Sequence, residues 1–450
     1  MPKLHLITYG CQMNEYDSER VAGLLRDERY ELTERAEDAD LILLNTCAIR
    51  EKCEDKVFSR LGELKHLKRE RPHVMIGVMG CMAQLWQGRI QERAPSVDLV
   101  FGSAAVSRVG ELVARARATG APVLETGEAP LVKITARSAG PGQLKAFVTV
   151  MEGCEKGCTF CVVPVTRGRE RSHSPASIVA EVRELAAAGV REVTLLGQTV
   201  NAYGRDLTPA TDLAELLELV NEVEGIERIR FTTSNPYNLT PRLIRAIQDV
   251  PKVVEYLHLP LQSGSDRVLD RMHRGYTRAR YLELIAELED TVPGIALSTD
   301  LIVGFPGEEE ADFEQTVGMV ERIRYDNAFI FRYSRRPGTP AATMPDQVSE
   351  EIKARRNSRL LEVATRVGAA RSRALEGRVL PILVDGVSRK NPQEATGRTR
   401  CNRVVNFDAH GRRLLGEVVP VLITQALPHS LRGELAGAGA EGRVLATAAV

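Results

Sequence analysis

Three cysteines on one short loop constrain this chain more than any other feature of its sequence. They are Cys154, Cys158 and Cys161, in the run M-E-G-C-E-K-G-C-T-F-C-V-V-P. Three thiolates this close together suit a [4Fe–4S] cluster, whose coordination is complete only with four cysteine ligands. One iron atom is then left open, and an open coordination position is what metal-assisted chemistry needs.

A zinc site is the main alternative reading of the triplet. Zinc sites usually show paired C-x₂-C motifs or added histidine ligands. No histidine lies within ten residues of Cys161 on either side. The spacing therefore favours the iron–sulfur cluster.

Length and composition indicate a multidomain protein that works in the cytoplasm. The chain has 450 residues, so about two to four domains are expected. The N-terminus lacks the features of a signal peptide, and no apolar run approaches the ~18–20 residues of a membrane helix. Eight cysteines in such a chain favour metal or redox chemistry over disulfides. We expect a monomer with no membrane partner.

Residues 1–135 are predicted to form the first domain, because strand and helix patterns alternate along them. The strand patterns cover residues 3–8, 41–45, 74–79 and 98–101, and the helical patterns cover 15–27, 54–70 and 82–92. This alternation predicts a doubly wound parallel sheet in an α/β fold.

The alternation restarts after a Gly- and Pro-containing stretch at 138–142, and predicts a second domain at 143–370. Its strand patterns cover residues 147–151, 192–196, 228–232, 256–260, 296–303 and 328–333. Helical patterns such as 177–188 and 213–223 separate them. This succession predicts a partial (β/α)₆ barrel, with its active site at the carboxyl ends of the strands. The cysteine triplet directly follows the first of these strands.

A predicted helix at 349–375 leads into a third region at 371–435. Short β-like runs at 379–384, 403–407 and 414–424 are separated by turn residues, which indicates a small antiparallel β-barrel. Between residues 371 and 434 the chain has eleven Lys or Arg and six Asp or Glu. This local excess favours nucleic-acid binding, although the 60 basic and 60 acidic residues of the whole chain cancel. Residues 436–450 are predicted to be a tail.

A second set of cysteines follows the strands of the first domain. Cys11, Cys47 and Cys81 each follow one of the first three predicted strands, two or three residues after its end. Parallel strands joined by crossover helices end at the same edge of a sheet, so these residues should converge on a second shared cluster. The alternative is that each is simply a buried small residue. Cys53 and Cys401 are predicted to take no part.

Together these features resemble the methylthiotransferase family of radical S-adenosylmethionine enzymes, across nearly the whole chain. The last region, with G-R-T-R-C-N-R-V-V-N-F, resembles the RNA-binding TRAM module. The chain departs locally from the family pattern at Asn235, where His is expected, and at Arg335, where Pro is usual. The other matching runs are Y-G-C-Q-M-N, N-T-C-A-I-R-E-K, V-M-G-C-M-A-Q, G-C-x-x-x-C-x-F-C-V-V-P-x-T-R-G-R-E, L-L-G-Q-T-V-N-A-Y-G, L-P-L-Q-S-G-S and T-D-L-I-V-G-F-P-G-E.

The resemblance implies two [4Fe–4S] clusters and S-adenosylmethionine as cofactors. The triplet cluster would bind and cleave S-adenosylmethionine, and the second cluster would carry the inserted sulfur. Gly197 and Gln198 would meet the amino group of S-adenosylmethionine, since Gln offers a carbonyl acceptor. Gly304 and Glu308 lie in a segment that would meet its adenine, and Phe160 would flank that ring. An ordinary turn at 197–198, and burial alone for Phe160, are the alternatives.

The resemblance also implies the reaction, which is addition of a methylthio group to carbon 2 of N6-isopentenyl-adenosine beside the anticodon of tRNA. The partners would be the anticodon stem-loop, opened for recognition, an electron donor and a sulfur or cluster supply system. Alternative targets are threonylcarbamoyl-adenosine of tRNA and an aspartate of a ribosomal protein. A non-catalytic iron–sulfur RNA-binding sensor is the alternative from another class.

Two groups of basic residues are the candidates for RNA contact. One lies in the third region and the other lies beside the expected barrel mouth, where a solvated helix face is the alternative. The first group is Lys390, Arg398, Arg400 and Arg403, and the second is Arg267, Arg271, Arg274, Arg278 and Arg280.

Overall fold

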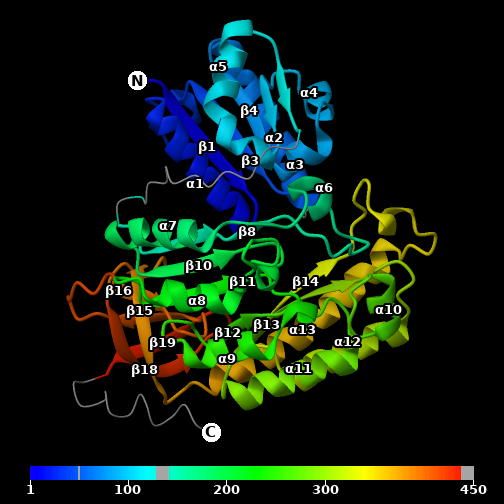
Figure 1. Cartoon of the computed structure of the whole chain (residues 1–450), viewed down its shortest axis with the longest axis vertical. Coiled ribbons are helices and arrows are strands. Elements are labelled where there is room, and N and C mark those ends of the chain that lie inside the picture. Colours follow the sequence, from blue (N-terminus) through cyan, green and yellow to red (C-terminus); the bar gives the residue numbers. More distant parts are fainter. Residues whose placement is uncertain (49–50, 128–139, 141, 437–450) are drawn as a thin grey trace.

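The computed structural model describes residues 1–48, 51–127, 140 and 142–436. Figure 1 shows three parts: an N-terminal α/β domain at the top, a larger barrel domain below it, and a small β-barrel at the lower left. Among the described residues, no helix has the length and apolar character needed to span a bilayer.

The N-terminal domain is a six-stranded, all-parallel sheet with helices on both faces. The strands follow the order β2-β1-β3-β4-β5-β6, and β3 and β4 are buried along their whole length. Such runs buried on both faces are typical of parallel sheets. The doubly wound sheet is therefore confirmed, and the short strands β2 and β6 were not predicted. The strands are β1 (Lys3–Tyr9), β2 (Glu31–Leu32), β3 (Leu41–Thr46), β4 (Met75–Gly80), β5 (Leu99–Phe101) and β6 (Val123–Glu125).

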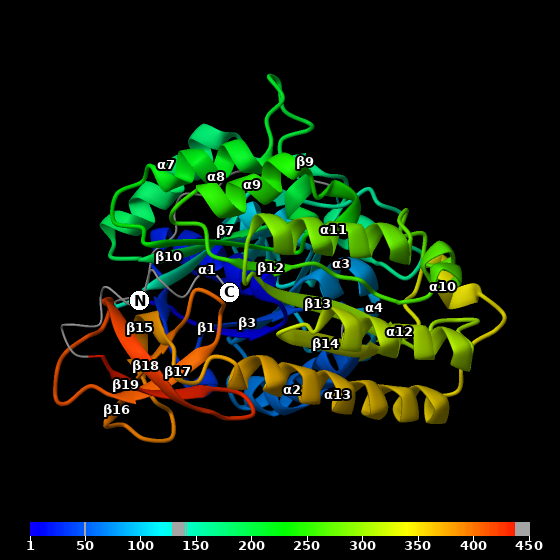
Figure 2. The same cartoon turned by 90° about the horizontal axis from the view of Figure 1, so that it is seen from below.

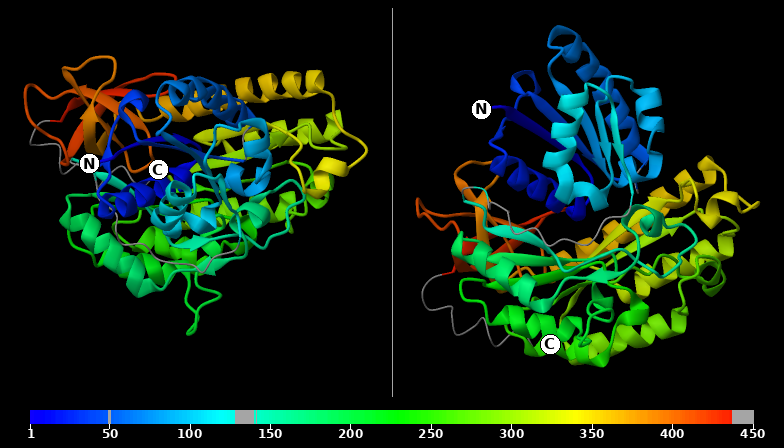
Figure 3. Two further views of the ribbon diagram at one scale, coloured as in Figure 1. Left: turned by 90° about the horizontal axis from the view of Figure 1, so that it is seen from above. Right: turned by 45° about the horizontal axis from the view of Figure 1, so that its top comes forward.

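The helices of this domain divide between the two faces of the sheet. The faces have separate apolar cores, one with α1 (Gln12–Asp27) and α5 (Val109–Thr119), the other with α2 (Glu51–Glu70), α3 (Cys81–Trp86) and α4 (Arg89–Arg93). Figure 3 shows this domain seated on the barrel domain, with α1 turned toward it.

The second domain is a partial barrel of six parallel strands, as predicted. Its two three-stranded sheets, β11-β10-β7 and β12-β13-β14, meet through a bridge between Ile229 and Val253. The strands are β7 (Lys145–Thr149), β10 (Glu192–Leu196), β11 (Arg228–Thr232), β12 (Tyr256–His258), β13 (Ala296–Val303) and β14 (Asn327–Arg332). A short hairpin, β8 (Met151–Glu152) and β9 (Arg171–Ser172), flanks the cysteine loop.

Helices cover the outer face of this barrel. Many begin at a Ser, Thr or Asp whose side chain accepts a hydrogen bond from the backbone N–H three residues on, which satisfies an otherwise unpaired donor. These helices are α7 (Pro175–Ala187), α8 (Leu213–Asn221), α9 (Pro241–Asp249), α10 (Asp266–Arg271), α11 (Arg278–Thr291), α12 (Glu310–Ile323) and α13 (Glu350–Arg373). The short helix α6 (Val163–Arg167) lies instead against α3 of the N-terminal domain.

The third part is a closed five-stranded barrel at one end of α13 (Figure 2). Its order is β15-β16-β17-β19-β18, and all neighbours are antiparallel except β17 and β19, which are parallel. The small barrel was predicted, whereas β16 and β19 were not. The strands are β15 (Val379–Val387), β16 (Glu394–Arg398), β17 (Val404–Asp408), β18 (Val418–Ala426) and β19 (Leu431–Leu435). The domain boundaries stay predictions, and the tail from 437 lies outside the described residues.

Candidate functional site

The cysteine triplet lies on a loop at the carboxyl end of the barrel strands, where the sequence placed it. The loop begins after β8, and backbone hydrogen bonds fix it on both sides. Cys154 donates its N–H to the carbonyl of Gly168 at 3.1 Å, and Thr159 donates to the carbonyl of Met272 at 3.1 Å. The loop is therefore held between the β8–β9 hairpin and the end of α10.

The three thiols of the triplet lie close enough to interact electrostatically. Burial raises the pKa of Cys161 to about 12, and the negative charges of Cys158 and Cys154 add to this rise. Burial likewise raises the pKa of Cys154, with a contribution from Cys158. A cationic iron cluster would relieve both costs, because metal binding favours the deprotonated thiolate. The donor set thus fits the cluster predicted for it.

Two polar side chains point at sulfur atoms of this triplet. The hydroxyl of Thr199, directly after the predicted Gln198, lies 3.2 Å from the Sγ of Cys154. The guanidinium of Arg274 donates to the Sγ of Cys158 at 3.2 Å. Neither residue was assigned to the cluster from the sequence, because a Thr in a strand-end turn and an Arg in a basic stretch carry no metal signal.

Cys11, Cys47 and Cys81 converge at one edge of the N-terminal sheet, as predicted. The strand register places Tyr9 beside Thr46 and Thr46 beside Gly80, so the residues that follow these strands are neighbours. A hydrogen bond with the Cys47 thiol, the positive charge of Arg167 and backbone hydrogen bonds outweigh burial and lower the pKa of Cys11 to about 6. Burial raises the pKa of Cys81, and the charge of Cys11 adds to this effect.

The second trio offers the donor chemistry of an iron–sulfur cluster, because thiolates are the usual ligands of such clusters. Among the described residues, no group of three or more His, Cys, Asp or Glu side chains is placed to hold a metal ion. Cys11 also begins α1, whose positive N-terminal end stabilises a thiolate.

A buried amide network fixes the backbone under the second trio. The side chain of Asn14 donates to Oδ1 of Asn45 at 2.9 Å, and Asn45 donates back to the carbonyl of Asn14 at 2.7 Å. Gly80 next to them has φ +91°, and a Cβ there would lie 2.4 Å from Oδ1 of Asn45. Only glycine fits this position, since backbone and side chain approach so closely.

Arg167 is a further residue of this site, and its position in the sequence alone did not indicate that role. Its Nε donates to the Sγ of Cys81 at 3.3 Å, and its Nη2 donates to Oδ2 of Asp17 at 2.6 Å. Arg167 ends α6, just after the triplet loop, so one short helix connects the two cysteine trios. The T-R-G-R-E run that contains it was the signal that could have found it.

The residues predicted for S-adenosylmethionine lie at the same end of the barrel as the triplet. The Oε1 atom of Gln198 accepts a hydrogen bond from the N–H of Gly153 at 2.6 Å, which ties the end of β10 to the start of the cysteine loop. A Cβ at Gly197 would lie 2.5 Å from Cγ of Met151, so the turn packs tightly against β8. Contact with the cofactor stays a prediction for both residues.

The segment after β13 meets the triplet loop through an aromatic contact. The ring of Phe160 packs edge-on against Phe305, with centroids 6.4 Å apart. Within the segment, the carboxylate of Glu308 accepts from the N–H of Gly304 at 2.5 Å and from Arg356 at 2.8 Å. Burial raises the pKa of Glu308 to about 7. Glu308 thus shapes the turn at Gly304, where φ is +71°.

Most of the basic residues predicted for RNA contact form hydrogen bonds or ion pairs with other groups of the protein. Arg400 forms an ion pair with Glu255 at 2.7 Å, and Arg403 forms one with Asp326 at 2.7 Å. These two side chains hold the small barrel on the barrel domain, and RNA contact by them stays a prediction. Arg398 bonds within its own barrel to Asn402, whereas Lys390 is exposed.

The arginines of the second basic group also form hydrogen bonds within the protein, while Arg267 and Arg280 remain exposed. Each of its arginines donates a hydrogen bond to a protein group, and RNA contact by this stretch stays a prediction. The partners are Asp312 for Arg267, Asp346 for Arg271, Cys158 for Arg274, Gln315 for Arg278 and Glu283 for Arg280.

Of the two cysteines predicted to take no part, Cys401 lies away from both trios, and the side chain of Cys53 is not among those described. Cys401 lies in the small barrel, where its Sγ is 3.0 Å from the hydroxyl of Thr399.

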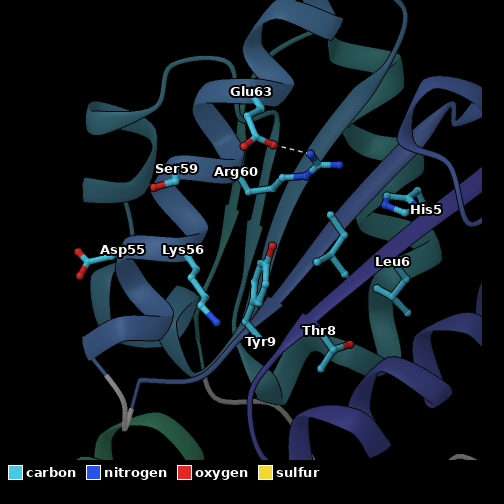
Figure 4. A pocket seen from close by; sticks show the side chains of 10 residues that line it. His5, Leu6, Thr8, Tyr9, Asp55, Lys56, Ser59, Arg60 and Glu63 are labelled. Carbon is cyan, nitrogen blue, oxygen red and sulfur yellow. Dashed lines mark hydrogen bonds and ion pairs between the residues drawn. The ribbon is translucent and has the colours of Figure 1, made fainter. Parts of the chain in front are cut away.

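A separate cavity lies at the outer edge of the N-terminal sheet, between β1 and α2 (Figure 4). It has a volume of about 720 Å³ and no cysteine among its lining residues. Lys56 and Tyr9 point into it, while Arg60 pairs with Glu63 on the wall. This cavity is therefore distinct from both cysteine sites.

Comparison with known proteins agrees with the three parts of the fold. Residues 3–102 match the uncharacterized protein family UPF0004, residues 148–320 match the radical SAM superfamily, and residues 373–436 match the TRAM domain. Among solved structures, the radical S-adenosylmethionine methyltransferase TsrM from Kitasatospora setae, with cobalamin and a [4Fe–4S] cluster bound, has a TM-score of 0.55. It is 14% identical, over 76% of this chain and 74% of its own, so it shows the fold alone.

Curated relatives cover nearly the full length of the chain. The tRNA-2-methylthio-N(6)-dimethylallyladenosine synthase of Moorella thermoacetica is 48% identical over 434 residues, which are 96% of this chain and 97% of the relative. The synthase of the same name from Thiobacillus denitrificans is 49% identical, over 96% of this chain and 98% of its own. The chain belongs to the radical S-adenosylmethionine methylthiotransferase family.

Proposed function

We propose that this protein is a tRNA-2-methylthio-N(6)-dimethylallyladenosine synthase, which adds a methylthio group to carbon 2 of N6-isopentenyl-adenosine beside the anticodon. The observation that carries the proposal is similarity at 48% identity, over nearly the full length of both chains, to a protein of that name. The two converging cysteine trios support it, since three cysteine ligands would leave one iron atom of a [4Fe–4S] cluster open.

Carbon 2 of an adenine is neither acidic nor electrophilic enough for ordinary acid–base catalysis. When bound, the clusters and S-adenosylmethionine supply the radical chemistry, the sulfur and the methyl group that such a carbon needs. Cys154, Cys158 and Cys161 would hold the cluster to which S-adenosylmethionine binds. The other trio, Cys11, Cys47 and Cys81, would hold the cluster that provides sulfur.

The chain's own residues would orient these groups and exclude water. Gln198 fixes the start of the triplet loop, and Thr199 bonds its first sulfur. Phe160 and the turn at Gly304 would border the adenosyl part of S-adenosylmethionine. Because α6 runs from the triplet loop to Cys81, a base placed beside this helix would be within reach of both trios.

The RNA partner would be the anticodon stem-loop of a tRNA, with the small barrel as a contributing surface. Arg230 donates to the carbonyls of Arg400 and Thr399 at 2.8 and 3.0 Å, so the small barrel is firmly attached to the barrel domain. Exposed Lys390 is then a candidate phosphate contact. We further propose that the protein acts as a cytoplasmic monomer and draws on an electron donor and a sulfur or cluster supply system.

The test is an anaerobic reaction with defined components. The protein is reconstituted with iron and sulfide, then supplied with reductant, S-adenosylmethionine and isopentenylated tRNA, and the digested nucleosides are analysed by mass spectrometry. A methylthio gain on isopentenyl-adenosine is the expected result. Cleavage of S-adenosylmethionine without that gain would point to another substrate, and neither event, with clusters present, would favour a non-catalytic RNA-binding protein.

A further inference from the structure

In each cysteine trio, one sulfur atom accepts a hydrogen bond from an arginine side chain. Arg167 donates to Cys81 at 3.3 Å, and Arg274 donates to Cys158 at 3.2 Å. The two arginines come from different parts of the barrel domain and contact different trios. The proposed reaction assigns neither of them a role.

Arg167 reaches its sulfur atom across the boundary between two domains. It stands at the end of α6 in the barrel domain, whereas Cys81 begins α3 in the N-terminal domain. Its side chain is 2% exposed, and its anionic partner Asp17 is 1% exposed. Asp17 is in turn 3.8 Å from Arg20, which pairs with Glu152 at 3.3 Å.

A buried guanidinium is costly unless its N–H groups are paired. Asp17 offsets part of this cost, but Nη1 of Arg167 has no hydrogen-bond partner among the described residues. A tie between the two domains would need only the Arg167–Asp17 pair. The additional Nε donation to sulfur therefore points to a role at the metal site.

Arg274 is held in a similar way beside the other trio. Its Nε donates to the hydroxyl of Tyr276 at 3.1 Å, and its Nη2 donates to the carbonyl of Pro260 at 3.4 Å. These bonds leave Nη1 directed at Cys158. No carboxylate is among the hydrogen-bond partners described for Arg274, so its charge faces the sulfur site without a close counter-ion.

We propose that Arg167 and Arg274 are positioning residues that each set the reduction potential of one cluster. Arg167 would act on the cluster held by Cys11, Cys47 and Cys81, and Arg274 on the cluster held by the triplet. The inference rests on the two clusters of the proposed function. Reduction adds negative charge, so an N–H donor and a positive charge at the sulfur stabilise the reduced form and raise the potential.

The experiment measures each cluster by itself in the full-length chain. One parent protein carries Cys→Ala at 154, 158 and 161, and the other carries Cys→Ala at 11, 47 and 81. Each is reconstituted anaerobically, and its cluster is titrated with dithionite at controlled potentials while the electron paramagnetic resonance signal of the reduced form is followed. Arg167→Gln and Arg274→Gln are introduced into both parents.

The expected result is a crossed pattern. Arg167→Gln lowers the reduction potential of the cluster in the first parent by at least about 59 mV, which for one electron corresponds to a tenfold change in the reduced-to-oxidised ratio. The same substitution leaves the second parent unchanged. Arg274→Gln does the reverse. An unchanged potential for both arginine variants in their own parent would overturn the inference.

Asp17→Asn separates electrostatics from loosened packing. It removes a negative charge but keeps the Arg167 donor, so it should leave the potential unchanged or raise it. If Asp17→Asn and Arg167→Gln both lower the potential, packing is the cause and the inference is wrong. Arg167→Lys keeps the charge and should lower the potential less than Arg167→Gln.

The same samples distinguish failure of this inference from failure of the proposed function. Iron content and the resonance signal of the first parent show whether a second cluster forms. A first parent without iron would contradict both the two-cluster proposal and the role of Arg167. A loaded cluster whose potential ignores Arg167 would contradict the inference alone.

Discussion

Among single residues, Glu308 links burial to a measurable dependence on pH. Its side chain is fully buried, and its pKa rises from 4.5 to about 7. Between these values the folded protein binds more protons at this site than the unfolded chain. Stability contributed at this site is therefore present below pH 4.5 and is lost as the pH rises toward 7, by at most about 3 kcal/mol.

Glu308→Gln should remove this loss of stability with rising pH. Urea unfolding of the metal-free protein between pH 5 and 8 measures the free energy of unfolding, which should fall less over that range in the variant than in the parent. The absolute stability of the variant is a separate quantity, because Gln also weakens the bond to Arg356. Parallel pH profiles for the two proteins would show that Glu308 does not titrate in this range.

Gly197 offers a second test at the residue scale. A Cβ there would meet Met151 at 2.5 Å and the backbone of Val200 at 3.2 Å. Gly197→Ala should destabilise the protein by about 1–3 kcal/mol through overpacking. Gly62→Ala is the matched control, since Gly62 lies in α2 with no neighbour within 4 Å, and it should be neutral or stabilising by about 0.5–1 kcal/mol. Equal effects in urea unfolding would contradict this packing argument.

At this scale the sequence predicted the cysteines and missed their hydrogen-bond partners. Cys11, Cys47 and Cys81 could be predicted as neighbours because each follows a strand, and parallel strands end together. Arg167 and Arg274 could not be predicted, because their role depends on which sulfur atom each side chain contacts. The ion pair of Arg400 could not be predicted for the same reason: a basic residue in a basic region gives no sign that Glu255 lies opposite.

Among the elements, α13 shows how a local signal fixes a boundary. Ser349 precedes the helix, and its side chain accepts a hydrogen bond from the N–H of Ile352 at 3.4 Å. Ser349→Ala should cost about 1 kcal/mol, because an N–H of the first turn loses its partner. Ser358→Ala, at an exposed position within α13, should be neutral, and thermal unfolding of both variants checks the contrast. A larger loss for Ser358→Ala would contradict the capping role.

The long strands and helices were predicted, and short or irregular ones were not. β3 and β4 were found because continuous apolar runs bounded by turns are a strong signal. β2 has only two residues, both exposed, so it leaves no pattern to read. The parallel pairing of β17 and β19 depends on closure of the small barrel, which local sequence does not encode.

At the scale of the whole molecule, attachment of the small barrel divides its basic residues into two groups. Lys390 is exposed, so Lys390→Ala should weaken tRNA binding and reduce the salt dependence of log Kd by about one, as loss of one phosphate contact predicts. Its thermal stability should not change. Binding titrations at several salt concentrations check this, and an unchanged salt slope would remove Lys390 from the RNA surface.

Arg400→Ala is the contrasting variant for this prediction. Its guanidinium pairs with Glu255 and donates to the carbonyl of Val253 at 2.5 Å. The substitution should therefore lower the thermal stability of the protein. A variant with full thermal stability and a reduced salt dependence of log Kd would show that Arg400 contacts RNA and is not needed for attachment of the small barrel.

The division of labour between the two cysteine trios is the central claim, and one mass-spectrometric measurement tests it. Reconstituted Cys158→Ala and Cys81→Ala proteins are incubated with reductant, S-adenosylmethionine and isopentenylated tRNA, and 5′-deoxyadenosine and methylthiolated nucleoside are quantified together. Cys158→Ala should yield neither product. Cys81→Ala should still yield 5′-deoxyadenosine but no methylthiolated nucleoside. Full methylthiolation by Cys81→Ala, or cleavage of S-adenosylmethionine by Cys158→Ala, would contradict the account.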